Sequence, residues 1–143
     1  TCEVDPAAAA APLPQARGDG QAVLLVDDEE PLVRLNEELL ADLGYEPVGF
    51  TSGTAALAAL RDDPQRFALL LSDENMPGIT GSELARAARA LRPGLPVVLM
   101  SGYVNPALQA RAREAGVAEV LAKPLASREI ARCLSTLLTE APA

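Results

Sequence analysis

Short apolar runs alternate with segments of helical periodicity along most of the chain, and this alternation limits the fold more than any other feature. Continuous apolar runs occupy Val23–Val26, Phe67–Ser72, Val97–Met100 and Ala118–Ala122, and Pro47–Phe50 is a weaker strand candidate. Because most of these runs lack polar alternation, they are typical of parallel strands that are covered on both faces. The sequence therefore predicts an α/β fold in which each of five strands precedes a helix.

Helical patterns follow every strand candidate. The first helix is predicted to begin near Pro31 and to end at Gly44, because leucines recur at helical spacing between them. Thr51 or Ser52 can cap a second helix that extends to about residue 61. The other predicted helices are 82–91, 106–115 and a last one that Ser127 can cap. Right-handed crossovers then give a five-stranded parallel sheet that is doubly wound, (βα)5.

The N-terminal segment differs in composition from the rest. Residues 5–22 are rich in alanine, proline and glycine, which is typical of a linker. A chain of 143 residues is long enough for one domain with a tail. We expect residues 1–21 to be a linker or the remnant of a preceding domain, and residues 22–143 to form one domain.

The charge and composition exclude several classes of function. The formal net charge is −8, which disfavours direct contact with nucleic acid. The chain has no histidine, so catalysis by Ser-His or Cys-His pairs and His-ligated metal sites are excluded. Two cysteines, Cys2 and Cys133, form neither a disulfide framework nor a zinc cluster. We expect a cytoplasmic protein. No apolar stretch is long enough to form a helix that spans a membrane, so no membrane contact by this domain is expected.

Polar side chains follow four of the five predicted strands. Asp27 and Asp28 follow the first strand, Asp73 the third, Ser101 the fourth and Lys123 the fifth. In open α/β sheets, ligands bind outside the carboxyl ends of the strands. The sequence therefore predicts that three carboxylates, one hydroxyl and one ammonium meet at one edge of the sheet.

Three carboxylates in one crevice repel one another unless a cation neutralises them. Oxygen ligands favour a hard divalent ion, and Mg²⁺ before Ca²⁺, because positions remain for water and phosphate oxygens. The ammonium of Lys123 and the hydroxyl of Ser101 complement a phosphoryl group. Asp73 is then the candidate nucleophile, since a carboxylate can accept a phosphoryl group.

The same residues lie in segments that resemble the receiver domain of the response regulator family, the phospho-acceptor module of two-component signalling. The matching segments within residues 22–140 are VLLVDDEE, LLLSDENMPGITG, VVLMSGY and LAKP, in that order. The resemblance implies a flavodoxin-like fold and phosphorylation of Asp73. It also implies that Asp28 binds Mg²⁺ directly, that Asp27 acts on it mainly through water, and that Asn75 supplies a backbone carbonyl.

The resemblance implies that two further side chains contact the phosphoryl group. Lys123 is expected to pair with the acceptor carboxylate and then with the phosphoryl group, and Ser101 to move and donate a hydrogen bond to it. The Lys123–Pro124 peptide is expected to be cis. The implied donor is a phosphohistidine of a histidine kinase or a histidine phosphotransfer protein, and the expected output is a switch in the face formed by the fourth helix and fifth strand.

One position departs from the family pattern. The family usually carries an aromatic residue on the fifth strand that turns inward when the hydroxyl residue moves, and Val120 occupies that place here. Valine has a stiff side chain without a hydroxyl, so the usual coupling cannot operate. Tyr103 is either a replacement that gates the mouth of the site or a partly exposed structural residue.

Other interpretations stay open at this point. The domain could be a pseudo-receiver that docks without being phosphorylated, or an aspartate-nucleophile phosphatase of another α/β family. Asp27 and Asp28 could merely cap a helix, and Ser101 could be a turn residue. Arg111 and Arg113 are interpreted as solvated rather than as a nucleic-acid surface.

We expect the chain to catalyse its own phosphorylation and dephosphorylation without being a conventional enzyme. We favour an origin as the C-terminal receiver of a hybrid sensor histidine kinase over a free-standing regulator. A second copy of the chain remains open as a partner.

Overall fold

Five strands and five helices alternate along the computed structural model, which describes residues 20–139. In chain order they are β2 (Ala22–Val26), α1 (Glu30–Asp42), β3 (Glu46–Phe50), α2 (Gly53–Asp62), β4 (Phe67–Asp73), α3 (Gly81–Leu91), β5 (Val97–Ser101), α4 (Pro106–Glu114), β6 (Glu119–Ala122) and α5 (Ser127–Thr139). The predicted alternation of strands and helices is confirmed. Most of the predicted linker, residues 1–19, lies outside the described residues.

All pairs of neighbouring strands in the sheet are parallel, in the order β3-β2-β4-β5-β6. The chain first adds β3 on one side of β2 and then continues with β4 on the other side. The direction of winding therefore reverses between β2 and β4, which is where such sheets open a crevice at their carboxyl edge. The predicted doubly wound sheet is confirmed, and its switch point adjoins the ends of the strands that precede Asp27 and Asp73.

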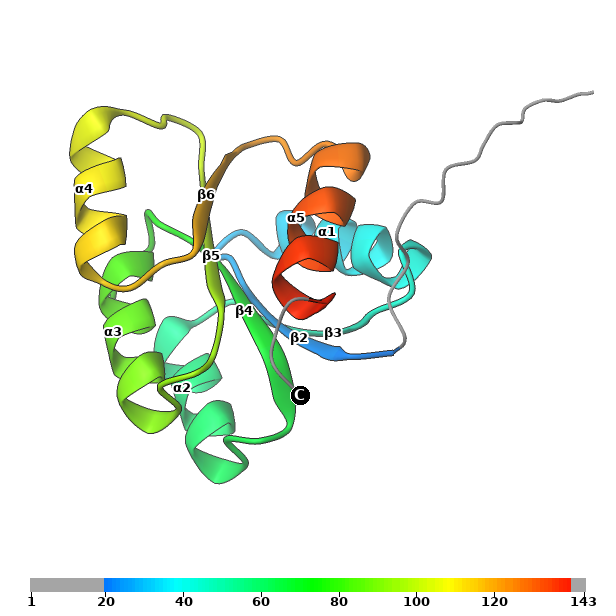
Figure 1. The fold of residues 1–143 in the computed structure, drawn as a ribbon, viewed down its shortest axis with the longest axis horizontal. Helices are drawn as coiled ribbons and strands as arrows, with labels where there is room; N and C mark the ends of the chain where they lie inside the picture. The colour runs from blue at the N-terminus through cyan, green and yellow to red at the C-terminus, as the bar shows by residue number, and fades with distance from the viewer. Residues whose placement is uncertain (1–19, 140–143) are drawn as a thin grey trace, which may run out of the picture.

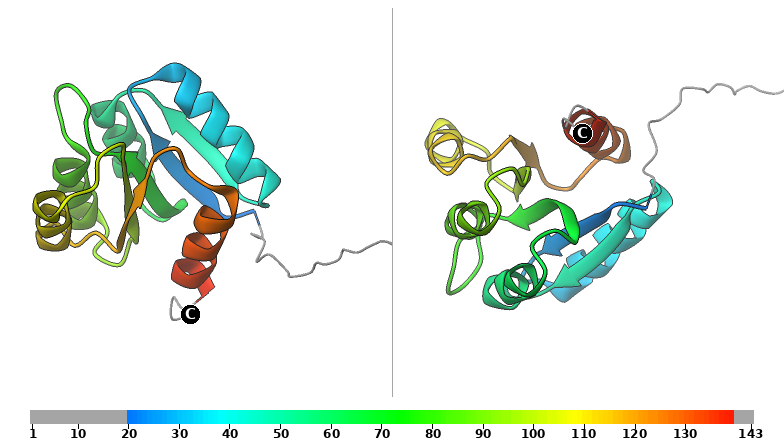
Figure 2. Two further views of the ribbon diagram at one scale, coloured as in Figure 1. Left: turned by 90° about the horizontal axis from the view of Figure 1, so that it is seen from above. Right: turned by 60° about the horizontal axis from the view of Figure 1, so that its bottom comes forward.

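Helices cover both faces of the sheet (Figures 1 and 2). Helices α2, α3 and α4 lie on one face, and α1 and α5 lie on the other. The sheet separates two apolar clusters: Leu60, Leu84 and Leu108 belong to the first, and Leu40 and Leu134 to the second. Burial on both faces explains why the central strands have continuous apolar sequences rather than alternating ones.

Side-chain caps fix where three of the helices begin. The Ser52 hydroxyl accepts a hydrogen bond from the backbone of Ala55, which confirms its predicted capping of α2. Thr80 and Glu83 form a reciprocal capping box at the start of α3, and Asn105 caps α4. Such caps satisfy N–H groups that the helix itself leaves unpaired.

The predicted cap of α5 is wrong by one position. The helix begins at Ser127 itself, so Ala126 occupies the preceding position, and its carbonyl accepts the N–H of Ile130. Helix boundaries commonly differ by one residue from a sequence-based expectation.

Among residues 20–139, no helix has both the length and the apolar character needed to cross a membrane.

The junction of β4 and α3 is packed so closely that any side chain at Gly81 would displace its neighbours. A Cβ atom on Gly81 would lie 2.5 Å from the carbonyl oxygen of Asp73 and 3.0 Å from the Cα of Glu74. The N–H of Gly81 also donates to the carbonyl of Glu74, at 3.0 Å. The first turn of α3 is therefore pressed against the backbone that carries the candidate nucleophile.

We predict that Gly81→Ala lowers the free energy of unfolding by about 1–3 kcal/mol, because backbone atoms must move to admit the methyl group. Gly94→Ala is the matched control, since nothing lies within 4 Å of a Cβ at that exposed glycine. It should change stability by less than about 0.5 kcal/mol. Urea denaturation of both variants measures the difference, and equal stabilities would contradict the close packing.

Candidate functional site

Three carboxylates lie together at the carboxyl edge of the sheet. Asp27 and Asp28 follow β2, and Asp73 is the last residue of β4. One carboxylate oxygen from each of the three residues lies within 4.8 Å of the other two. Asp27 and Asp73 are buried, whereas Asp28 is exposed, so the cluster has one side open to solvent.

Lys123 brings a positive charge to this cluster from the end of β6. Its Nζ lies 2.9 Å from Oδ2 of Asp27 and 3.4 Å from Oδ1 of Asp73. The ammonium therefore bridges the first and third strand ends and is closer to Asp27 than to the candidate nucleophile. The following peptide, Lys123–Pro124, is cis, as predicted.

Burial and neighbouring charges raise the pKa values of two groups in the site, for different reasons. Burial raises the pKa of Asp73 to about 6; Lys123 opposes this shift, and the negative charges of Asp27 and Asp28 add to it. For Lys123, burial alone would lower the pKa, but hydrogen bonds and charge from Asp27 and Asp73 raise it. The ammonium therefore stays charged near neutral pH, while the Asp73 carboxylate is held at an energetic cost.

Ser101 lies at the end of β5 with its hydroxyl engaged by its own loop. The Oγ donates to the carbonyl of Tyr103 at 3.0 Å and accepts from the N–H of Tyr103 at 3.1 Å. In the present arrangement the hydroxyl therefore makes the contacts of a turn residue, at the end of the strand that pairs with the one carrying Asp73. Any new hydrogen bond from this hydroxyl to a ligand requires the bond that it donates to Tyr103 to break.

Asp27 uses its two carboxylate oxygens differently. Its Oδ1 accepts the N–H of Glu29 at 3.0 Å, two residues further along, while Oδ2 faces Lys123. Glu29 itself occupies the N-cap position of α1, and no side chain caps that helix end. The helix-capping alternative for Asp27 is therefore wrong, and its carboxylate serves the preceding turn and the ion pair with Lys123.

The remaining predicted positions differ in their exposure to solvent. Asn75 lies in the loop after Asp73 with an exposed side chain. Val120 is half-buried and packs against the apolar cluster beneath α2, α3 and α4. The Tyr103 side chain is 75% exposed, so it does not fill the inward position that an aromatic residue would occupy.

Sequence reasoning missed Glu74, the residue directly after the candidate nucleophile. Glu74 is only 3% exposed, and its Oε1 accepts hydrogen bonds at 2.8 Å from both the N–H and the hydroxyl of Ser82. Its Oε2 lies 3.5 Å from Nε of Arg111 on α4. A single acidic letter after an apolar strand gives no signal of these partners, which lie 8 and 37 residues further along the chain.

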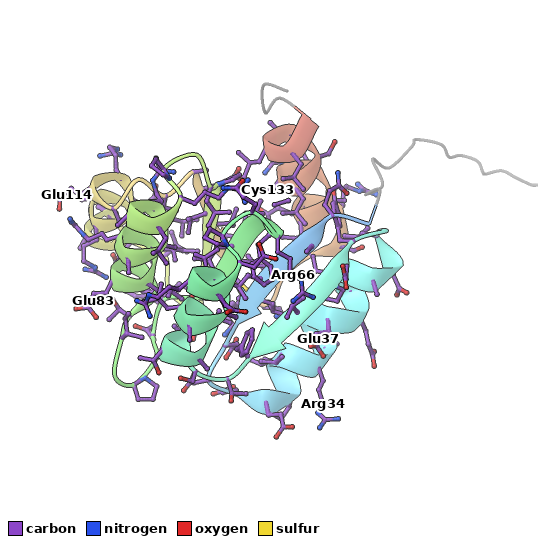
Figure 3. The ribbon with its side chains drawn as sticks, turned by 90° about the horizontal axis from the view of Figure 1, so that it is seen from below. Arg34, Glu37, Arg66, Glu83, Glu114 and Cys133 are labelled. Carbon is purple, nitrogen blue, oxygen red and sulfur yellow. The ribbon has the colours of Figure 1, made fainter. Side chains whose placement is uncertain are left out.

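Cys133 lies on α5 (Figure 3). Its side chain is fully buried, and burial raises the pKa of the thiol to about 12. A thiol that stays protonated is a poor nucleophile. Cys133 therefore serves packing, in the apolar cluster that α1 and α5 share.

Comparison with known proteins identifies the class to which this fold and this charge cluster belong. A family model described as the response regulator receiver domain matches residues 23–135. The chain therefore belongs to the family of receiver domains of two-component signalling systems, as the resemblance implied.

Relatives place this domain in proteins of very different length. The chain is 32% identical over 119 residues to the response regulator receiver protein CpdR of Brucella abortus, covering 83% of this chain and 98% of that protein. It is 37% identical over 127 residues to the virulence sensor protein BvgS of Bordetella pertussis, covering 84% of this chain but only 10% of BvgS. It also spans 23% of the transcriptional regulatory protein DctD of Rhizobium meliloti.

Solved structures agree with the fold. The chemotaxis protein CheY4 of Vibrio cholerae superposes with a TM-score of 0.77 at 28% identity, covering 83% of this chain and 99% of that one. The receiver domain of a sensor histidine kinase from Pseudomonas aeruginosa PAO1 superposes with a TM-score of 0.76 at 26% identity, covering 85% and 99%. That structure has a magnesium ion coordinated in its active site cleft.

The raised pKa of Asp73 predicts a stability difference that depends on pH. Between pH 4 and 6 the unfolded chain loses this proton before the folded chain does, so folding becomes less favourable as pH rises. Asp73→Asn removes the buried charge and should raise the free energy of unfolding by about 2 kcal/mol at pH 7.5 without divalent ions. The gain should vanish near pH 4.

Denaturation of both proteins across this pH range measures the effect. Asp62→Asn is the control, because Asp62 is exposed at the end of α2. It should shift stability by less than about 0.5 kcal/mol at every pH. A stability gain for Asp73→Asn that is the same at pH 4 and pH 7.5 would contradict a buried, titrating carboxylate.

Proposed function

We propose that this domain accepts a phosphoryl group on Asp73 from a phosphohistidine of a partner protein, with Mg²⁺ bound beside it. The observation that carries this proposal is the meeting of three carboxylates within 4.8 Å with the Lys123 ammonium 3.4 Å from Asp73. This arrangement offers a nucleophile, a cation site and a fixed positive charge at one sheet edge. The pseudo-receiver, which docks without phosphorylation, is the alternative that the experiments below distinguish.

The donor set fits magnesium. Carboxylate and carbonyl oxygens are the ligands that hard divalent cations prefer, and the described cluster offers the carboxylates of three aspartates. The neighbouring Lys123 is a charged ammonium, which has no lone pair for a metal. Asp28 would bind the ion directly, Asp27 mainly through water, Asp73 through one carboxylate oxygen and Asn75 through its backbone carbonyl. When bound, Mg²⁺ neutralises charge on the phosphoryl oxygens and on the carboxylates.

The chain's own residues then perform the transfer. A carboxylate oxygen of Asp73 attacks phosphorus in line, the bond from phosphorus to the imidazole nitrogen of the partner breaks, and the electron pair stays on that nitrogen. Lys123, already beside Asp73, holds the negative charge that the new acyl phosphate carries. Ser101 donates its hydroxyl hydrogen to a phosphoryl oxygen after leaving the carbonyl of Tyr103.

Water removes the phosphoryl group by attacking the phosphorus of the acyl phosphate. The bond from phosphorus to the Asp73 oxygen breaks, which leaves the Asp73 carboxylate and inorganic phosphate. The domain thus promotes its own phosphorylation and dephosphorylation while being the substrate of its partner. The phosphoryl group changes the loop after β5, and through it the face formed by α4 and β6. We describe this as a shift between two packings of one fold.

The whole-protein setting is part of the proposal. We favour an origin in a hybrid sensor histidine kinase, because the chain is 37% identical to a segment of BvgS, a virulence sensor protein. The partner is then a histidine kinase or histidine phosphotransfer protein, and the location is the cytoplasm. Residues 1–21 serve as a linker or domain remnant, and residues 22–143 as the receiver.

Intact mass tests the acceptor directly. With Mg²⁺ and a small phosphodonor such as acetyl phosphate or phosphoramidate, the 143-residue chain should gain the mass of one phosphoryl group. Asp73→Asn and the wild-type chain with a chelator should gain nothing, because the nucleophile or the neutralising cation is missing. Asp62→Asn is the control and should behave as the wild type.

A wild-type chain that gains no mass under these conditions, and whose Tm does not respond to Mg²⁺, would favour the pseudo-receiver. Mass gain that persists in Asp73→Asn would place the acceptor elsewhere and overturn the assignment.

The role of Ser101 generates a separate prediction. Ser101→Ala should weaken binding of beryllofluoride, a phosphoryl mimic, by about tenfold in the presence of Mg²⁺, because one hydrogen bond to a charged group is lost. Ser101→Thr keeps the hydroxyl and should bind within about threefold of the wild type. Titration followed by ¹⁹F NMR measures both, and equal affinities of the alanine and threonine variants would contradict a hydrogen bond to the phosphoryl group.

A further inference from the structure

The buried carboxylate of Glu74 joins the acceptor strand to two helices. Its Oε1 accepts two hydrogen bonds from Ser82 in the first turn of α3, and its Oε2 faces Arg111 on α4. Its backbone N–H donates to the carbonyl of Met100 on β5, at 2.9 Å. Glu74, directly after Asp73, therefore contacts β5, α3 and α4.

Arg111 connects this carboxylate to a helix with little apolar contact of its own. Helix α4 buries only Leu108 and Ala112, whereas the neighbouring α3 buries five of its residues. The Arg111 side chain is 53% exposed, but the Glu74 side chain is 5% exposed, so the ion pair is partly withdrawn from solvent. With so few buried side chains, α4 depends more on this ion pair than a well-buried helix would.

The start of α4 is also tied to the site, through Ser101. The Ser101 hydroxyl bonds the backbone of Tyr103 on both sides, and Asn105, two residues further, caps the helix by accepting the N–H of Leu108 at 2.8 Å. If the hydroxyl turns toward Asp73, it gives up the hydrogen bonds that it makes with the Tyr103 backbone. The loop and the start of α4 that follows it can then shift. The helix is thus held at its start by Ser101 and further along by Glu74.

We propose that the Glu74–Arg111 ion pair clamps α4 in the arrangement seen here and thereby lowers the affinity of the Asp73 site for a phosphoryl group. The inference rests on the proposed function and adds a positioning pair to it. Because the pair stabilises only one of two arrangements of α4, breaking it shifts the population toward the other. A ligand that favours the other arrangement then binds more tightly.

A second ion pair between the same two helices gives a useful contrast. Arg86 on α3 and Glu114 on α4 lie 3.9 Å apart, and both side chains are more than half exposed. Figure 3 shows Glu114 at the outer edge of α4, away from the core. Exposed pairs of this kind contribute little, so breaking this one should leave the arrangement of α4 unchanged.

The test measures beryllofluoride affinity at saturating Mg²⁺ by ¹⁹F NMR, and Mg²⁺ affinity alone by calorimetry, on the 143-residue chain. Arg111→Gln and Glu74→Gln should each bind beryllofluoride about threefold to tenfold more tightly than the wild type. Their Mg²⁺ affinity should stay within about twofold, because the clamp acts on α4 and not on the cation ligands. Glu74→Gln keeps an oxygen for Ser82.

Two control variants and one double variant complete the test. Arg113→Gln removes the same charge from an exposed position of α4, and Glu114→Gln breaks the exposed pair; both should bind as the wild type does. The double variant Glu74→Gln/Arg111→Gln should gain no more than either single variant, because both changes break one interaction.

Arg111→Gln that binds beryllofluoride no more tightly than Arg113→Gln would overturn the clamp, as would gains that add in the double variant. Arg111 is half-exposed, so this variant should stay folded even if Glu74→Gln does not. Failure of the wild type itself to bind beryllofluoride with Mg²⁺ would instead overturn the proposed function.

Discussion

Like charges gathered at one buried sheet edge are the constraint on which the rest of the site depends. Among residues 20–139, three carboxylates share this edge with the ammonium of Lys123, which lies closer to Asp27 than to Asp73. One positive charge cannot balance three negative ones, and burial adds to the difficulty of ionising Asp73. The unbalanced negative charge consequently destabilises the folded chain at this edge. Binding of a divalent cation or protonation of Asp73 would reduce this destabilisation.

The sequence was sufficient for the fold and for the meeting of the charged residues, for a topological reason. Buried parallel strands require continuous apolar runs, and the carboxyl ends of such strands share one edge. Residues as distant as Asp27 and Lys123 could therefore be placed together from the strand order alone. The boundaries were less certain, as the start of α5 at Ser127 shows.

What the sequence could not predict depends on side-chain direction. Nothing in the letters around Glu74 indicates that its carboxylate turns to Ser82 and Arg111 and not to solvent. The same is true of Ser101, whose hydroxyl bonds its own loop in this arrangement. The Thr80–Glu83 capping box is a contrast, because a threonine followed three residues later by a glutamate is itself a sequence signature of a helix start. Hydrogen bonds between distant segments appear only once the chain has been packed in three dimensions.

The substitution at Val120 takes on meaning beside these contacts. Val120 is half-buried and Tyr103 is largely exposed, so neither supplies the inward-turning ring of the family pattern. The ties that remain between the site and α4 are polar: the Ser101 hydroxyl on the loop, and the Glu74 carboxylate on Arg111. Polar ties are directional and sensitive to ionic strength, whereas a rotating ring depends on the volume available to it.

The separation of the apolar interior by the sheet has an architectural consequence. Helices α1 and α5 share one cluster, and α2, α3 and α4 share the other, with the strands standing between them. Repacking of α4 against its own cluster can therefore proceed without disturbing the side chains on the opposite side. Substitutions on one side of the sheet need no compensating substitutions on the other side. One surface can therefore acquire a new binding preference during evolution while the other keeps its own.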